Sequence, residues 1–149
     1  PISVINTKMS PSLNIIPHLE GEGAILYQME NWSMPEVRSY RVSYKNGFNS
    51  EVIAFTFTLF FQHSGSFQNI GQYVGNLTVE ASEVYVAWGF EFNANSELVG
   101  IANVGSAKNP VASAIIRVNY SAKNIINELR GAQSMYVDGR GNVRVMAQE

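Results

Sequence analysis

Hydrophobic and polar positions alternate along much of the chain, and a long uncharged run lies between Glu51 and Glu80. The 28 residues from 52 to 79 contain no Asp, Glu, Lys or Arg. Within residues 52–61, the positions of one parity carry large apolar side chains, namely Ile53, Phe55, Phe57, Leu59 and Phe61. These side chains share one face, because successive side chains of a strand point to opposite faces. Ten residues are too few for a membrane-spanning helix, which needs about 20, so the pattern predicts a central β-strand.

The same alternation predicts further strands, which turn residues separate. The predicted strands cover residues 24–29, 37–45, 51–61, 72–79, 83–92, 111–120, 133–137 and 142–146. Asn46-Gly47 predicts a hairpin that pairs 37–45 with 51–61, because both central residues of a type I′ turn need a positive φ. Asp138-Gly139-Arg140-Gly141 predicts a second hairpin near the end of the chain. In 83–92, the predicted inward side chains are Val84, Val86, Trp88, Phe90 and Phe92.

Other segments lack the alternation of a strand. Residues 31–36 are predicted to be a turn, 62–71 a polar loop, and 93–110 an irregular stretch with a short strand near 97–102. Residues 121–131 are ambiguous. The helical spacing there is matched by Ala122, Ile125, Ile126 and Leu129, with Ser121 as N-cap and Gly131 as C′ glycine. We predict a helix, with a strand that continues from 111–120 as the rival.

The N-terminal part, residues 1–22, contains Pro11 and Pro17. It is predicted to form an extended arm with one or two short edge strands, since proline suits sheet edges. The chain then has eight or nine strands and at most one short helix. These features predict an all-β fold, a two-layer antiparallel β-sandwich of jelly-roll or immunoglobulin-like topology. A length of 149 residues predicts a single domain.

The chain carries few charges, and this removes several classes of partner. Charged residues make up 15% of the chain, against roughly 25% in an average protein, while Asn and Ser occur 15 times each. The net charge is −2 without any basic run, so we expect no nucleic-acid partner and little attraction to anionic lipid. Cysteine is absent, so there is no disulfide or thiolate site. We expect no signal peptide, and the location stays open between leaderless secretion and processing of a precursor.

Few residues are available for catalysis: two histidines, His18 and His63, and one aspartate, Asp138. Asp138 lies in an Asp-Gly turn, where local hydrogen bonding explains it. A Ser-His-Asp triad would require that aspartate to meet one of the two histidines, and nothing in the pattern favours this. Oxygen-bearing side chains at alternate positions of 91–97 could hold Ca²⁺, but a strand running into an Asn-rich turn explains them better. We therefore predict no enzyme activity, no metal and no cofactor.

The leading hypothesis is a non-enzymatic binding protein that recognises a carbohydrate or another cell-surface ligand. Aromatic side chains near turns can stack on sugar rings, and amides and hydroxyls supply oriented hydrogen bonds. Loops on a rigid scaffold are the expected place for such a site. The candidate ligand-binding residues are Trp32, His63, Phe67, Tyr73, Asn93 and Asn95. For Trp32, the alternative is a packing role at a turn.

Two further hypotheses use the uncharged residues 52–79. In a self-associating subunit of a virion, tail or inclusion, these residues and the apolar arm would be buried between copies, since such an edge aggregates when exposed. In a membrane-active or pore-forming protein, residues 52–61 would supply a transmembrane strand, which needs about 9–11 residues. Because Phe60-Phe61 breaks the alternation of a lipid-facing strand, a core strand is the favoured interpretation.

Overall fold

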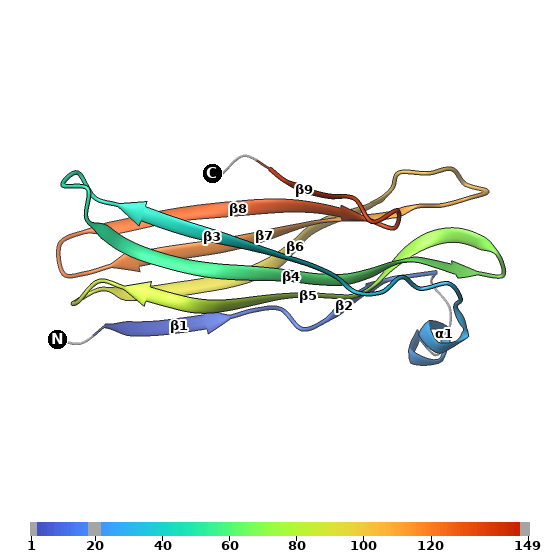
Figure 1. Cartoon of the computed structure of the whole chain (residues 1–149), viewed down its shortest axis with the longest axis horizontal. Helices are drawn as coiled ribbons and strands as arrows, with labels where there is room; N and C mark the ends of the chain where they lie inside the picture. Colours follow the sequence, from blue (N-terminus) through green and yellow to red (C-terminus); the bar gives the residue numbers. More distant parts are fainter. Residues whose placement is uncertain (1–2, 18–21, 147–149) are drawn as a thin grey trace.

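The computed structural model describes residues 3–17 and 22–146, which form two β-sheets packed face to face (Figure 1). The elements in chain order are β1 (Val4–Lys8), β2 (Leu13–Ile15), α1 (Glu22–Gln28), β3 (Glu36–Lys45), β4 (Glu51–Phe67), β5 (Ile70–Val86), β6 (Glu91–Asn103), β7 (Ala112–Lys123), β8 (Glu128–Asp138) and β9 (Val143–Val145). The predicted all-β sandwich with at most one short helix is confirmed.

Each sheet is largely a meander of consecutive hairpins. One sheet has the order β1-β6-β7-β8-β9 and the other has the order β2-β5-β4-β3. Among the described strands, β1 and β6 pair in parallel, whereas the other neighbours are antiparallel. β1 and β2 lie at sheet edges, as predicted for the proline-containing arm. The rest of that arm, residues 1–2 and 18–21 with His18, lies outside the described residues.

The first half of β4 lies at the centre of the core. Its inward side chains are all 0% exposed, namely Ile53, Phe55, Phe57, Leu59 and Phe61. The centroid of the Phe55 ring lies 5.2 Å from that of Phe92 on β6 and 5.4 Å from that of Tyr120 on β7, so this ring joins the two sheets. Full burial of such a side chain stabilises a fold by about 1.5–3 kcal/mol. The prediction of a central core strand at 52–61 is therefore confirmed.

Both predicted hairpins are present. Residues 36–45 pair with 51–61, and β8 pairs with β9 across the Asp138 turn. The first connection is longer than a two-residue turn, because Asn46 organises a wider loop. Its side-chain oxygen accepts hydrogen bonds from the backbone N–H groups of Phe48 at 2.9 Å and Ser50 at 3.1 Å.

Residues 62–71, predicted to be a polar loop, instead extend a second long hairpin. β4 continues to Phe67 and β5 begins at Ile70. Gln68 and Asn69 form the turn, and both have a positive φ, 52° and 63°, as a type I′ turn requires. Polar side chains did not end the strand because its backbone stays paired with β5.

The predicted strand 83–92 is in fact the end of one strand, a turn and the start of the next. β5 ends at Val86 and β6 begins at Glu91, with Gly89 in the connecting turn at a φ of 84°. Trp88, predicted to face inward, is 73% exposed. When apolar residues occupy alternate positions of a turn, their pattern is the same as that of a strand, because alternation alone does not show where the backbone reverses direction.

Residues 24–29 were predicted to be a strand, but helix α1 covers most of them. Ile25 and Met29 lie one helical turn apart, and both are buried, at 6% and 5% exposure. The Met29 N–H donates to the Ile25 carbonyl at 2.9 Å. Short apolar segments of this kind fit either a helix or a strand, and packing decides between them. No helix in the described part of the chain is long and apolar enough to span a membrane.

Residues 121–131 do not form the predicted helix, and the rival strand describes them better. β7 runs to Lys123, and β8 begins at Glu128 after a short turn. Within that turn, the Asn124 side-chain oxygen accepts hydrogen bonds from the backbone N–H groups of Ile126 at 3.0 Å and Asn127 at 2.7 Å. Local bonding by an asparagine side chain offers the backbone an alternative to a helix.

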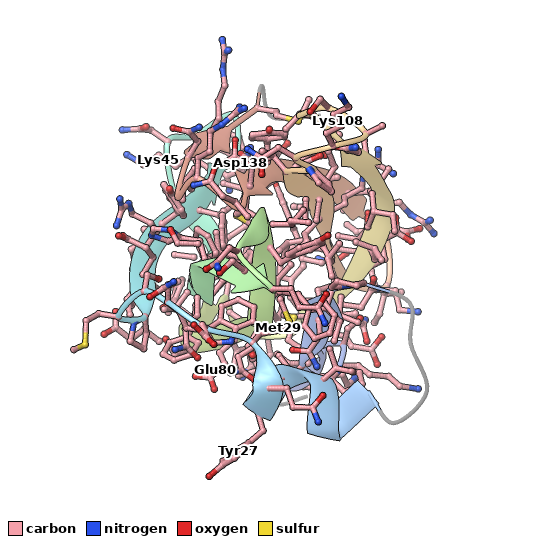
Figure 2. All side chains as sticks on the ribbon, turned by 90° about the vertical axis from the view of Figure 1, so that its right-hand side faces the viewer. Tyr27, Met29, Lys45, Glu80, Lys108 and Asp138 are labelled. Carbon is pink, nitrogen blue, oxygen red and sulfur yellow. The ribbon has the colours of Figure 1, made fainter. Side chains whose placement is uncertain are left out.

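The sandwich is elongated, and its two ends differ (Figure 1). The loop end carries the turns 46–50, 87–90 and 124–127. The helix end, seen in Figure 2, carries α1, from which Tyr27 points away from the body. It also carries the β4–β5 turn, the β6–β7 loop and the β8–β9 turn. Backbone bonds tie this end together: Gly139 donates to the carbonyl of Ala112 and accepts from the N–H of Ser64, both at 2.8 Å.

Candidate functional site

Trp32 lies between α1 and β3, where it packs on the β4–β5 hairpin. Its indole N–H donates to the carbonyl oxygen of Leu26 at 3.4 Å. The ring covers two glycines, so closely that a Cβ added to Gly65 would lie 2.5 Å from it and one added to Gly75 would lie 3.1 Å from it. Trp32 is thus a packing residue at a turn, which is the alternative to ligand binding that the sequence leaves open.

Three other candidate residues lie on the β4–β5 hairpin, but their neighbours differ. The Nδ1 atom of His63 lies 2.7 Å from the Ser64 hydroxyl, and Phe67 ends β4 opposite Ile70. Tyr73 lines an apolar pocket of about 350 Å³ beside the β6–β7 loop. Burial raises the pKa of the Tyr73 hydroxyl above its ordinary value of 10.0. These contacts do not bring the three side chains to one common ligand position.

Asn93 and Asn95 lie on the outer face of β6, together with amides from both neighbouring strands. Asn6 on β1 donates its side-chain N–H to Asn93 Oδ1, and Asn119 on β7 donates to Asn95 Oδ1, both at 3.1 Å. Asn93, Asn95 and Asn119 line a polar hollow of about 290 Å³ on this face. Two of the six candidate residues therefore do share one surface.

The carboxylates that flank these asparagines are engaged in ion pairs. Glu91 lies 3.4 Å from the Lys123 ammonium, and Glu97 lies 3.3 Å from the Arg117 guanidinium. No group of three or more His, Cys, Asp or Glu side chains that could hold a metal ion occurs among the described residues. The outer face of β6 is thus a solvated amide surface with paired charges.

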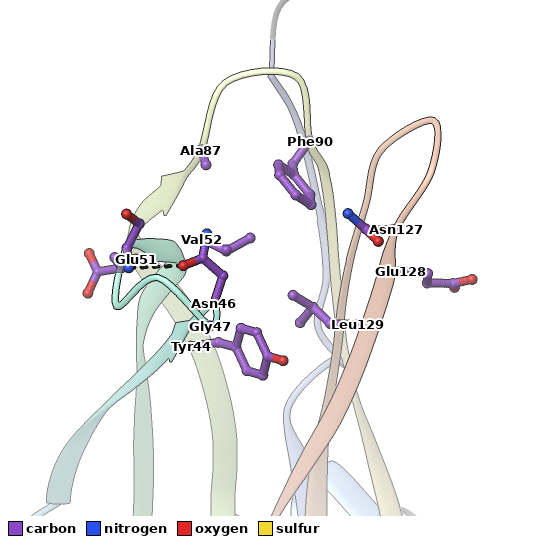
Figure 3. A pocket seen from close by; sticks show the side chains of 11 residues that line it. Tyr44, Asn46, Gly47, Glu51, Val52, Ala87, Phe90, Asn127, Glu128 and Leu129 are labelled. Carbon is purple, nitrogen blue, oxygen red and sulfur yellow. Dashed lines mark hydrogen bonds between the residues drawn. The ribbon is translucent and has the colours of Figure 1, made fainter.

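Another pocket, of about 380 Å³, lies at the loop end, where three hairpin turns meet (Figure 3). Phe90, Leu129 and Tyr44 point into the space between the two sheets and Asn127 lies beside it, whereas the side chain of Glu128 points away from it. The full lining is Tyr44, Asn46, Gly47, Ser50, Glu51, Val52, Ala87, Phe90, Asn127, Glu128 and Leu129. An apolar interior with a polar rim is the usual construction of a small-molecule site.

Hydrogen bonds hold the turns of this pocket in place. The Ala87 N–H donates to the Val52 carbonyl at 2.8 Å, which joins the β5–β6 turn to the start of β4. The Ser3 hydroxyl donates to the Ala87 carbonyl at 3.0 Å. The turn between β7 and β8 is closed by the Asn124 N–H, which donates to the Asn127 carbonyl at 2.8 Å. The pocket is therefore largely formed before any ligand arrives.

Large apolar side chains project into solvent from the same three turns. We call them the apolar tips: Phe48, Trp88, Ile125 and Ile126, which are 92%, 73%, 97% and 83% exposed. The turn sequences NGFNS, AWGF and NIIN contain no charged residue. Single exposed apolar residues are ordinary, whereas a group of them at one end of a molecule marks an interaction surface.

The sequence does not single out the loop end, because its patterns predict buried faces for most of the apolar residues that are exposed there. Trp88 is predicted on the inward face of a strand, and Ile125 and Ile126 on the apolar face of a helix. Phe90, also predicted to face inward, does point between the two sheets. The signal that was present is the pair of flanking asparagines in NIIN and the Trp-Gly step in AWGF. Both are typical of turns.

Asp138 lies at the opposite end, in the β8–β9 turn, and is 2% exposed. Its carboxylate accepts hydrogen bonds from the backbone N–H groups of Arg140 at 2.9 Å and Asn142 at 3.1 Å. It also accepts from the Asn142 amide and the Tyr136 hydroxyl, both at 2.9 Å. Burial raises the pKa of this carboxyl, but the hydrogen bonds outweigh burial and hold the pKa below its ordinary 3.8. The turn thus explains Asp138, as the sequence indicates.

The lowered pKa predicts that this turn weakens in acid. A carboxyl whose folded pKa lies below its unfolded value contributes stability that is fully present above about pH 4 and is lost as the pH falls through the folded pKa. We expect Asp138→Asn to flatten the pH dependence of the free energy of unfolding below about pH 4. Urea denaturation across that range measures it. Equal acid sensitivity in variant and wild type would show that other carboxyls are responsible.

The geometry of the loop end is therefore the basis for a functional assignment. It combines a preformed pocket with exposed apolar side chains on every turn around it. Comparisons of the chain with protein-family models, with curated proteins and with solved structures find no significant match.

Proposed function

We propose that the protein binds a carbohydrate of a cell surface in the loop-end pocket. One observation carries this proposal: the aromatic residues Tyr44 and Phe90 line the same pocket as the amide-bearing residues Asn46 and Asn127. An aromatic ring packs against the C–H face of a sugar, while amides and carboxylates exchange hydrogen bonds with its hydroxyls. The pocket thus has both kinds of contact that a sugar requires.

The size of the pocket sets the size of the ligand. Its volume of about 380 Å³ lies near the lower end of the range of about 300–1,000 Å³ for small-molecule sites. It therefore suits a terminal sugar unit better than an extended chain. The pocket lies among the three turns of the loop end, so the remainder of a glycan can continue toward the surface that carries it.

The polar groups of the rim are held in fixed positions. The Asn46 side-chain oxygen accepts two backbone hydrogen bonds, which fix the side chain and leave its amide nitrogen as a donor. Side chains that are already ordered lose little freedom on binding, which improves affinity.

We expect the double variant Tyr44→Ser/Asn127→Ala to weaken glycan binding by about tenfold or more. The variant removes one stacking ring and one amide while leaving the core untouched, since Tyr44 is 44% exposed. A glycan array probed with the whole chain identifies the preferred sugar. Isothermal titration calorimetry with that sugar then gives the affinity of variant and wild type.

The matched control is Tyr27→Ser, which removes an equally large aromatic side chain that is 93% exposed at the helix end. This control should bind the sugar like the wild type, and circular dichroism should show all three proteins folded. If the wild type captures no glycan, or if both variants bind equally well, the proposal is wrong.

A further inference from the structure

We infer that the apolar tips dip into the interface of a lipid bilayer whose headgroups are zwitterionic. The inference rests on the proposed function in one respect, because both place the loop end against a cell surface. It uses different residues, since Phe48, Trp88, Ile125 and Ile126 point outward and do not line the pocket. The pocket can then hold a sugar while the tips touch the lipid around it.

The shape of the tips favours a fluid partner over a folded one. They stand on three separate turns that project beyond the strands at one end of an elongated molecule (Figure 1). A protein partner would need a preformed hollow for each of them. A bilayer rearranges around each protrusion, and Phe, Ile and Trp side chains are those that peripheral proteins immerse at the headgroup boundary.

Tryptophan adds a depth preference. An indole ring is enriched at membrane–water interfaces, because its apolar body and its N–H group suit the two sides of that boundary. Trp88 is 73% exposed in its turn, and it carries this amphipathic ring at the extremity of the molecule. The exposed ring thus fits the headgroup level, with the flanking strands remaining in water.

The charges around the tips point to zwitterionic lipid. The uncharged turns are flanked at the strand ends by two lysines, Lys45 and Lys123, and by three glutamates, Glu51, Glu91 and Glu128. Lys123 lies 3.4 Å from Glu91 and is paired with it. Attraction to anionic lipid requires an excess of basic residues, and the charged residues around the tips have no such excess. Zwitterionic headgroups carry both positive and negative charges, as do the strand ends around the tips.

The first measurement uses vesicles of phosphatidylcholine alone, so that no sugar is present. The wild-type chain should sediment with these vesicles, and lipids brominated in the acyl chain near the headgroup should quench the emission of Trp88. The double variant Ile125→Ser/Ile126→Ser should bind them about tenfold more weakly or worse, because two of the four apolar tips become polar. Trp88→Ser should weaken binding and abolish most of the quenching, since Trp32 is packed against Gly65 and Gly75.

The matched control is Tyr27→Ser/Met34→Ser, which removes two side chains that are 93% and 84% exposed away from the loop end. It should bind vesicles like the wild type. Absence of sedimentation by the wild type, or equal loss in the control, would overturn the inference. So would a mass by light scattering that is doubled in the wild type and single in the isoleucine variant, because a second copy would then cover the tips.

The two proposals fail separately. Ile125→Ser/Ile126→Ser should keep its affinity for the soluble sugar, whereas Tyr44→Ser/Asn127→Ala should keep its binding to phosphatidylcholine vesicles. Vesicle binding without sugar binding would leave the membrane contact and remove the carbohydrate site. Sugar binding without vesicle binding would do the reverse.

Discussion

Replacing Phe55 with alanine should lower the free energy of unfolding by about 3–5 kcal/mol, a large part of the about 5–15 kcal/mol that stabilises a typical domain. The side chain is 0% exposed and its ring packs against those of Phe92 and Tyr120 from the opposite sheet. The substitution leaves a cavity between the sheets that neither rigid sheet can close. Urea denaturation followed by tryptophan emission measures the change.

The control for Phe55 is another phenylalanine on the same hairpin. Phe48→Ala should change stability by less than about 0.5 kcal/mol, because that side chain is 92% exposed. A loss below about 1 kcal/mol for Phe55→Ala would contradict a core in which this ring joins both sheets.

The second large effect is expected at the helix end. A Cβ added to Gly139 would stand 2.1 Å from the carbonyl oxygen of Gln72 and 2.5 Å from its carbon. The backbone of Gln72 cannot move away as a flexible side chain could, because its N–H donates a hydrogen bond to the Pro110 carbonyl at 2.9 Å. Gly139→Ala should therefore cost about 3 kcal/mol, at the upper end for overpacking, and should lower the thermal midpoint.

Gly100→Ala serves as its comparison, since an added Cβ there meets nothing within 4 Å. This variant should unfold at the wild-type temperature or slightly above it, because alanine restricts the unfolded chain. Equal stability of the two alanine variants would mean that the loops of the helix end are free to move apart.

Much of the fold follows from a period of two in the apolar residues. The strand at 52–61 and its partner at 37–45 are recognised because one parity is apolar and the other polar over many residues. The pattern fails where apolar residues also occupy turns. Residues 83–92 keep the parity of a strand through Trp88 and Phe90, although the backbone reverses direction there. An alternating pattern of apolar residues does not show whether a given apolar side chain is buried or exposed.

The candidate site was less predictable for the same reason. Polar loops are the expected place for ligand-binding residues, but two of the candidates, His63 and Phe67, lie in a regular strand. Asn93 and Asn95 do share a surface, because side chains two apart on a strand point the same way. The loop end breaks the rule that exposed positions are polar, and places where local rules fail are often functional.

The parallel pairing of β1 with β6 has a consequence for how the protein opens. Val4 pairs with Glu91, which lies far from it in the sequence. Forming this contact closes a long loop and therefore costs much conformational entropy, so it contributes little to the folding nucleus. All five residues of β1 are exposed, so few apolar contacts resist its release. β1 is therefore the strand that docks last and frays first. Each time it frays, the edge of β6 from Glu91 to Asn95 becomes open as a template for another extended segment.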